Sequence, residues 1–107
     1  MKQYDSIDIF IEYIKENSGG GSIVLVSTNK KAPLQQISSK LVNAGVLEET
    51  INYYFYNEKQ PLDIHIFKQQ KMIILAEKEY KTKLNHINRL KQILHTIDKE
   101  FSGIILY

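Results

Sequence analysis

The chain has 107 residues and contains no cysteine, no tryptophan, two prolines and a single arginine. Without cysteine it can form neither a disulfide framework nor a thiolate-ligated zinc site, and redox chemistry on protein thiols is excluded. Because small secreted domains commonly rely on disulfides, this composition predicts a cytoplasmic location. No apolar run approaches the roughly 20 residues of a membrane-spanning helix, so we expect a soluble chain with no membrane partner.

The charge of the chain is also low, at +2 from 14 basic and 12 acidic residues. Proteins that bind nucleic acids usually concentrate lysine and arginine on one face, and a balance this mild does not favour a nucleic-acid partner. Lysine greatly outnumbers arginine, and isoleucine, asparagine and tyrosine are abundant, as AT-rich coding DNA tends to produce. This usage associates the chain with a low-GC bacterium or a mobile element.

The first half of the chain predicts two helices around one strand. Apolar residues at helical spacing over residues 7–14 indicate an amphipathic helix, with Asp5 as a candidate N-cap and Gly19 near its end. Residues 23–26 are apolar on both faces of a strand and predict a buried central strand. A second helix begins at Pro33 and ends before Gly45, a residue suited to the C′ position. A right-handed crossover then places the next strand parallel to the first.

The middle of the chain predicts three consecutive strands, INYYFYN, PLDIHIF and KMIILAEKEY, between residues 51 and 80. Short polar turns separate them, which favours an antiparallel meander. Two faces alternate along the first two strands. One face carries Ile51, Tyr53, Phe55, Leu62, Ile64 and Ile66, and the other carries Tyr54, Tyr56, His65 and Phe67. One face must pack against the core, and the other needs a cover from the same domain, a second chain or a ligand.

A helix over about residues 82–99 and a final strand, IILY, complete the pattern. The predicted order α-β-α-β-β-β-α-β makes one α+β domain over residues 1–107. We expect a mixed sheet of about five strands with an antiparallel meander, one βαβ crossover and about three helices packed on it. This arrangement resembles ferredoxin-like folds of the small regulatory type with an extra strand. The segment LQQISSKLVNAGV resembles the first helix of amino-acid-binding regulatory domains.

One candidate site lies in PLDIHIFKQQKMIILAEKEYK, whose charged residues resemble the core of PD-(D/E)XK nucleases. In that family an Asp and a Glu on adjacent strands hold a divalent cation, and a Lys two residues after the Glu polarises the attacking water. The resemblance implies Asp63 as the aspartate, Glu77 or Glu79 as the glutamate, Lys81 as the lysine and Mg²⁺ as the cofactor. Glu77 departs from the pattern, because Glu79 and not a lysine follows it by two positions. The alternative is that these residues form a turn and a solvated strand end.

A second candidate site is the loop STNKKAP, because ligands in crossover folds collect where strands end and helices begin. Ser27, Thr28, Lys30 and Lys31 would bind an anion there, as in a small regulatory domain for an anionic metabolite. The alternative is that Ser27 or Thr28 caps the second helix. A P-loop is excluded, because the glycines precede the strand and no Gly-Lys-Ser/Thr sequence occurs.

Other catalytic chemistry is not indicated. The histidines at positions 65, 86 and 95 make no pair with the spacing of metal ligands, so we predict no metal or cofactor outside the nuclease interpretation. No serine lies in a Gly-x-Ser-x-Gly elbow. The sequence therefore leans away from an enzyme.

The aromatic face favours protein binding instead. Tyr54, Tyr56, His65 and Phe67, with Lys59 nearby, would anchor a partner in the way that aromatic residues do at protein interfaces. The alternative is that the first or the last helix covers this face within the domain. The resulting hypothesis is a small non-enzymatic binding module, in one version an immunity or antagonist protein that neutralises a toxin or host enzyme. A homodimer is compatible with the same face.

Overall fold

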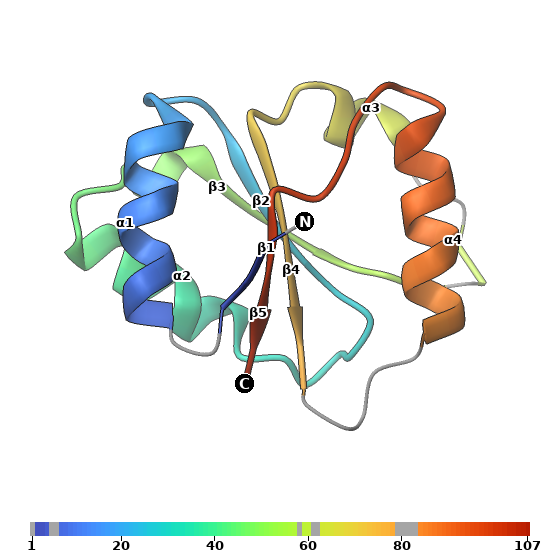
Figure 1. The fold of residues 1–107 in the computed structure, drawn as a ribbon, viewed down its shortest axis with the longest axis horizontal. Coiled ribbons are helices and arrows are strands. Elements are labelled where there is room, and N and C mark those ends of the chain that lie inside the picture. The colour runs from blue at the N-terminus through green and yellow to red at the C-terminus, as the bar shows by residue number, and fades with distance from the viewer. Residues whose placement is uncertain (1, 5–6, 58, 61–62, 79–83) are drawn as a thin grey trace.

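Five parallel strands form the centre of the protein in a computed structural model (Figure 1). The structure describes residues 2–4, 7–57, 59–60, 63–78 and 84–107. The strands are β1 (Lys2–Tyr4), β2 (Ile23–Ser27), β3 (Ile51–Phe55), β4 (Met72–Glu77) and β5 (Gly103–Leu106). Their order across the sheet is β1-β5-β4-β2-β3, so β1 and β3 are its edges.

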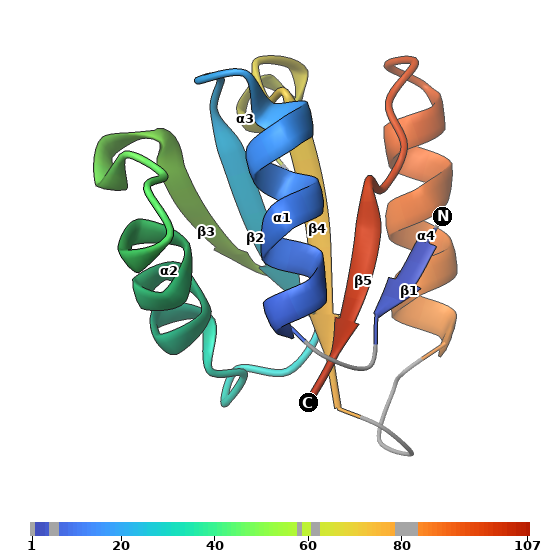
Figure 2. The ribbon, with the colours of Figure 1, turned by 60° about the vertical axis from the view of Figure 1, so that its left-hand side comes forward.

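Helices cover both faces of this sheet. They are α1 (Ile7–Ser18), α2 (Leu34–Asn43), α3 (Ile64–Lys68) and α4 (Leu84–His95), and a short 3₁₀ turn, η1 (Glu48–Thr50), precedes β3. The two views show α1 and α2 on one face and α3 and α4 on the other, which gives three layers (Figures 1 and 2). Within the described ranges, no helix combines the length and the apolarity needed to cross a membrane.

The alternation of side chains along the central strands divides the core in two. Ile23 and Leu25 of β2 pack with α1 and α2, whereas Val24 and Val26 pack with α3 and α4. Every residue of β2 and of β4 is buried. Strands covered on both faces read as continuous apolar runs, and the prediction of a buried central strand at residues 23–26 is confirmed.

Two local predictions from the first half of the chain are also confirmed. Gly45 has φ +107°, and the Val46 N–H donates to the Leu41 carbonyl at 3.0 Å, so the glycine ends α2 as expected. The crossover is parallel, with Ile23 of β2 opposite Ile51 of β3. Asp5, the predicted N-cap of α1, lies outside the described residues.

The predicted antiparallel meander and mixed sheet are wrong, although the chain does combine helices and strands. β2 lies between β3 and β4, and all pairings are parallel. A parallel return from β3 to β4 requires a crossover, and residues 64–68 form α3 within it instead of a strand. The Asp63 carboxylate accepts the His65 N–H at 3.0 Å and caps this helix. Isoleucines at positions 64 and 66 fit a strand by alternation, but both are exposed on the short helix.

Sequence reasoning missed one strand. β1 has three residues and pairs with β5 from Lys2 opposite Gly103 to Tyr4 opposite Ile105. A segment of this length carries too little periodicity to be recognised, because its place in the sheet comes from backbone pairing with a strand about 100 residues later.

Candidate functional site

The carboxyl ends of β2 and β4 lie side by side at a point where the connections diverge. From β2 the chain crosses through α2 to β3, and from β4 it crosses through α4 to β5 on the other side of the sheet. In open parallel sheets, ligands bind in the crevice beside such a point. The residues at these strand ends are therefore the first candidates for a site.

A buried carboxylate joins the two strand ends. Glu77, the last residue of β4, is 1% exposed. Its Oε1 accepts the Thr28 N–H at 2.8 Å, and the Thr28 hydroxyl is 2.8 Å from Oε1 and 2.9 Å from Oε2. A buried charge without partners is costly, and Thr28 supplies a backbone and a side-chain donor. The contact ties the loop after β2 to the end of β4.

Tyr107 and Asn29 extend this polar cluster. The Asn29 side-chain amide donates to the Tyr107 hydroxyl at 3.2 Å, and the Asn29 N–H donates to the Ser27 hydroxyl at 3.1 Å. Partial burial raises the pKa of Tyr107 above its ordinary value of 10.0, and the negative charge of Glu77 acts in the same direction. Hydrogen bonds with Asn29 and Ser27 oppose this shift without reversing it. Tyr107 is therefore a neutral phenol at pH 7.

The loop before α2 does not follow the capping alternative. The Thr28 hydroxyl bonds Glu77, and Ser27 accepts from Asn29, so neither caps α2. Pro33 occupies the N-cap position with no side-chain hydrogen bond. Lys30 and Lys31 are exposed. The anion site at Ser27, Thr28, Lys30 and Lys31 therefore stays a prediction. The start of α2, which has no side-chain cap, lies beside it.

The aromatic face predicted to bind a partner is covered within the domain, as its alternative stated. Tyr54 and Phe67 form an edge-to-face pair with ring centres 5.2 Å apart, and Tyr56 lies 5.1 Å from the His86 ring of α4. Tyr56 is 6% exposed and Phe67 is fully buried, whereas His65 and Lys59 are exposed. The face closes because Tyr54 and Tyr56 point to the side of the sheet that α3 and α4 cover.

The opposite face of β3 is the one left open. Tyr53 is 47% exposed and Phe55 is 40% exposed, and Val42 of α2 is exposed on the same side. A groove of about 200 Å³ runs between α2 and Tyr53, lined by Gln35, Ser38, Ser39, Val42, Asn43, Glu48 and Tyr53. We call Val42, Tyr53, Phe55 and the free backbone of β3 the β3 edge surface.

The free backbone groups of β3 follow from its pairing with β2. The Tyr56 N–H donates to the Ser27 carbonyl at 2.8 Å, and successive residues of a strand point their backbone groups to opposite sides. Asn52 and Tyr54 therefore face β2. The N–H and C=O groups of Tyr53 and Phe55 and the C=O group of Ile51 face away from β2, where no strand among the described residues pairs with them. The Ile51 N–H already donates to the Glu48 carbonyl at the end of η1.

The residues of the nuclease interpretation do not come together. Asp63 caps α3, which lies beside the amino end of β4, whereas Glu77 is the last residue of that strand (Figure 1). Glu79 and Lys81 lie outside the described residues. Within the part of the chain that the structure covers, no three His, Asp or Glu side chains are grouped to hold a metal ion.

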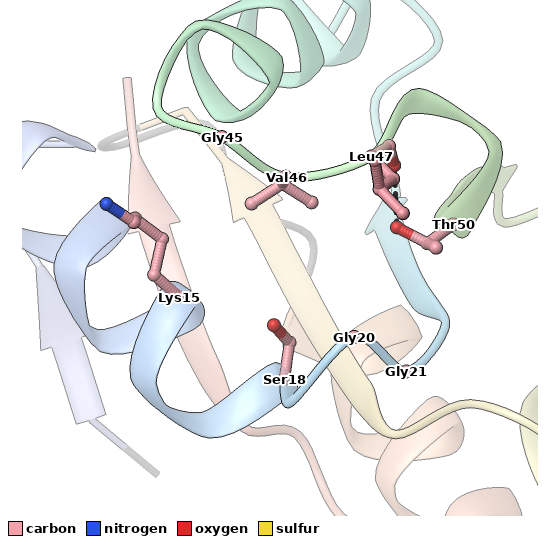
Figure 3. Close-up of a pocket in the computed structure, with 8 residues that line it drawn as sticks. All are labelled: Lys15, Ser18, Gly20, Gly21, Gly45, Val46, Leu47 and Thr50. Atoms are coloured by element: carbon pink, nitrogen blue, oxygen red, sulfur yellow. Dashed lines mark hydrogen bonds between the residues drawn. The ribbon is translucent and has the colours of Figure 1, made fainter.

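A hollow of about 160 Å³ lies where α1 ends and where β2 and β3 begin (Figure 3). It is lined by Lys15, Ser18, Gly20, Gly21, Gly45, Val46, Leu47 and Thr50. The Thr50 hydroxyl donates to the Leu47 carbonyl at 2.6 Å, so one of its polar groups is engaged. Lys15 is the one ionisable residue in this lining, which offers no acid–base pair.

Comparison with known proteins does not assign the site, because no protein-family model, no curated protein and no solved structure matches the chain.

Proposed function

We propose that this chain is a non-enzymatic binding module that recognises another protein by accepting one of its strands at the β3 edge. The observation that carries the proposal is the β3 edge surface itself. Residues 51–55 contain no charged residue and no proline, and they expose Tyr53 and Phe55 beside backbone groups that pair with no other strand of the described residues. Natural proteins usually protect such edges with lysine, proline or a bulge, and β3 has none of these.

The physical basis of the binding is strand addition. Backbone hydrogen bonds to Tyr53, Phe55 and the Ile51 carbonyl would supply affinity, while side chains on alternate positions of the added strand would meet Tyr53 and Val42. Tyrosine is among the residues that contribute most at interfaces. The protein-binding hypothesis is thus kept, and its surface moves from Tyr54 and Tyr56 to the other face of β3.

The polar cluster at the carboxyl ends supports a non-enzymatic module. Glu77 is buried, and both of its oxygens are within hydrogen-bonding distance of Thr28. A catalytic carboxylate must reach a substrate or a water molecule, so this arrangement favours a structural role for Glu77. Neutralisation of a toxin or enzyme is the narrower form of the proposal, with the cytoplasm as the location.

The test is capture of partners from the source lysate by tagged protein, with a variant carrying Tyr53→Lys and Phe55→Lys. The matched control is Leu84→Lys, which adds a charge at an exposed apolar residue of α4, on the face of the sheet opposite to the Tyr53 side chain. We expect a stoichiometric protein that is retained by the control and lost from the variant. Equal capture by both proteins would contradict binding through the β3 edge surface.

A further inference from the structure

The arrangement of the β3 edge is compatible with a partner related to it by a twofold axis. Ile51, Tyr53 and Phe55 are evenly spaced, and all three face away from the sheet. In an antiparallel pair, two residues opposite each other exchange both of their backbone hydrogen bonds at every second position. A twofold axis through Tyr53 would place Tyr53 opposite the same residue of a second copy, and Ile51 opposite Phe55. The two Tyr53 residues would then exchange both of their backbone hydrogen bonds, and the Phe55 N–H of each copy would donate to the Ile51 carbonyl of the other, while the Ile51 N–H keeps its bond to the Glu48 carbonyl.

We propose that the occupant of this edge is a second copy of the chain, paired antiparallel through β3 to join two five-stranded sheets. This inference rests on the proposed function, because it uses the same edge, and it names the partner. The twofold axis is perpendicular to the sheet, so the α2 side of one copy continues into the α2 side of the other. The exposed rings of Tyr53 from both copies therefore meet on that side. Cross-strand aromatic pairs of this kind stabilise sheets.

The charges around β3 are complementary under the same symmetry. Exposed Glu48 and Glu49 precede the strand, and exposed Lys59 follows it. An antiparallel pair brings the acidic end of one copy beside the end of the other copy that carries Lys59. A parallel pair would instead place the acidic ends together. The neighbouring Glu58 in the sequence reduces the net charge at that end, so a charge-reversal experiment is the direct check.

The groove beside α2 leaves room for the second copy. It has a volume of about 200 Å³, and Tyr53, Ser39 and Val42 are among the residues that line it. The small side chains of Ser38 and Ser39 keep the α2 wall of the groove low. Close approach of the two α2 helices over the joined strands is therefore compatible with the shape of this surface.

The experiment is sedimentation equilibrium of the full chain over a range of concentrations, for wild type, Tyr53→Lys, Phe55→Lys and the Leu84→Lys control. We expect a dimer for wild type and the control. Tyr53→Lys places two lysines opposite each other and should raise the dissociation constant about tenfold or more. Circular dichroism checks that each variant is folded, and Phe55→Lys gives an independent test should Tyr53→Lys lose its fold.

Charge reversal tests the direction of pairing. Glu49→Lys and Lys59→Glu should each weaken the dimer by about two- to fivefold, as expected for exposed ion pairs, and the double variant should recover it. A wild type that remains monomeric at every concentration overturns the second-copy inference. If a different protein is then captured through Tyr53 and Phe55, the proposed function stands alone. If neither dimerisation nor capture of a partner depends on Tyr53 and Phe55, the second-copy inference and the proposed function are both overturned.

Discussion

Thr28 holds the carboxylate of Glu77 from two sides, with its backbone N–H at 2.8 Å and its hydroxyl at 2.8 and 2.9 Å. The two residues are 49 positions apart in the sequence: Glu77 ends β4, and Thr28 directly follows the neighbouring strand β2. Removing the Glu77 carboxylate leaves the Thr28 N–H and hydroxyl without this buried acceptor, and removing the Thr28 hydroxyl leaves Glu77 with one donor fewer.

Thr28→Val removes the hydroxyl and keeps the N–H and the shape of the side chain. A hydrogen bond to a charged group contributes about 1.5–3 kcal/mol, so we expect the free energy of unfolding to fall by about that amount. Urea denaturation measures it. Ser39→Ala is a matched control, because Ser39 is exposed and its hydroxyl donates to the Gln35 carbonyl of its own helix. Equal stability of Thr28→Val and wild type would contradict the role given to this contact.

Phe67→Ala tests the cover over the aromatic face of β3. Phe67 is fully buried and packs edge-to-face on Tyr54, so its truncation should lower the free energy of unfolding by about 3–5 kcal/mol. Ile66→Ala, at the exposed neighbouring residue, is the control and should cost much less. An unchanged stability for Phe67→Ala would mean that this face is open and that Tyr54 and Tyr56 are available to a partner after all.

Gly45→Ala tests the end of α2. Gly45 has φ +107°, a region that residues with a Cβ rarely adopt, although no atom lies within 4 Å of the position that a Cβ would take. We therefore expect a loss of about 1 kcal/mol or more from backbone strain alone. Thermal unfolding measures the loss, with Asn43→Ala at the same helix end as the control. This control changes a side chain without placing a Cβ at a positive φ. A gain in stability would show that the backbone here relaxes freely.

The two tyrosines with shifted pKa values predict a loss of stability at alkaline pH. Burial raises the pKa of Tyr54 and of Tyr107 above 10.0, so the folded state favours the neutral phenols. Their contribution is complete below pH 10.0 and is lost as the pH rises through the folded-state values.

Urea denaturation on both sides of pH 10.0 should show this loss, and Tyr54→Phe and Tyr107→Phe should each reduce it. In a pH titration, the phenolate absorbance should rise at a higher pH in the folded protein than in the unfolded one. A stability that is independent of pH in this range, or that increases, would contradict the prediction.

Local signals in the sequence predicted the parts of the fold that depend on neighbouring residues. The end of α2 at Gly45 could be predicted because glycine is the residue type that most readily adopts the positive φ found after a helix. The continuous apolar run of β2 indicated burial on both faces. The meander was wrong because pairing is not local: β4 forms its ladder with β2, almost 50 residues away, and not with β3.

For the candidate sites too, the sequence predicted local features but not contacts between distant residues. Alternation placed Tyr53 and Tyr54 on opposite faces, which is confirmed, but it could not show which face the helices cover. Thr28 and Glu77 were each singled out, in two different hypotheses, and only the parallel pairing of β2 and β4 brings them together. The signal that could have joined them is a polar residue at the end of each of two fully apolar strands.

The central claim is that β3 accepts a further strand, and amide hydrogen exchange followed by NMR tests it residue by residue. In the monomeric Tyr53→Lys variant, the Phe55 amide and the amide at position 53 should exchange rapidly, while those of Asn52 and Tyr54, which face β2, stay protected. In wild type at high concentration, or with its captured partner, the Tyr53 and Phe55 amides should become protected as well. Exchange at these outward amides that does not change with concentration or partner would contradict the account.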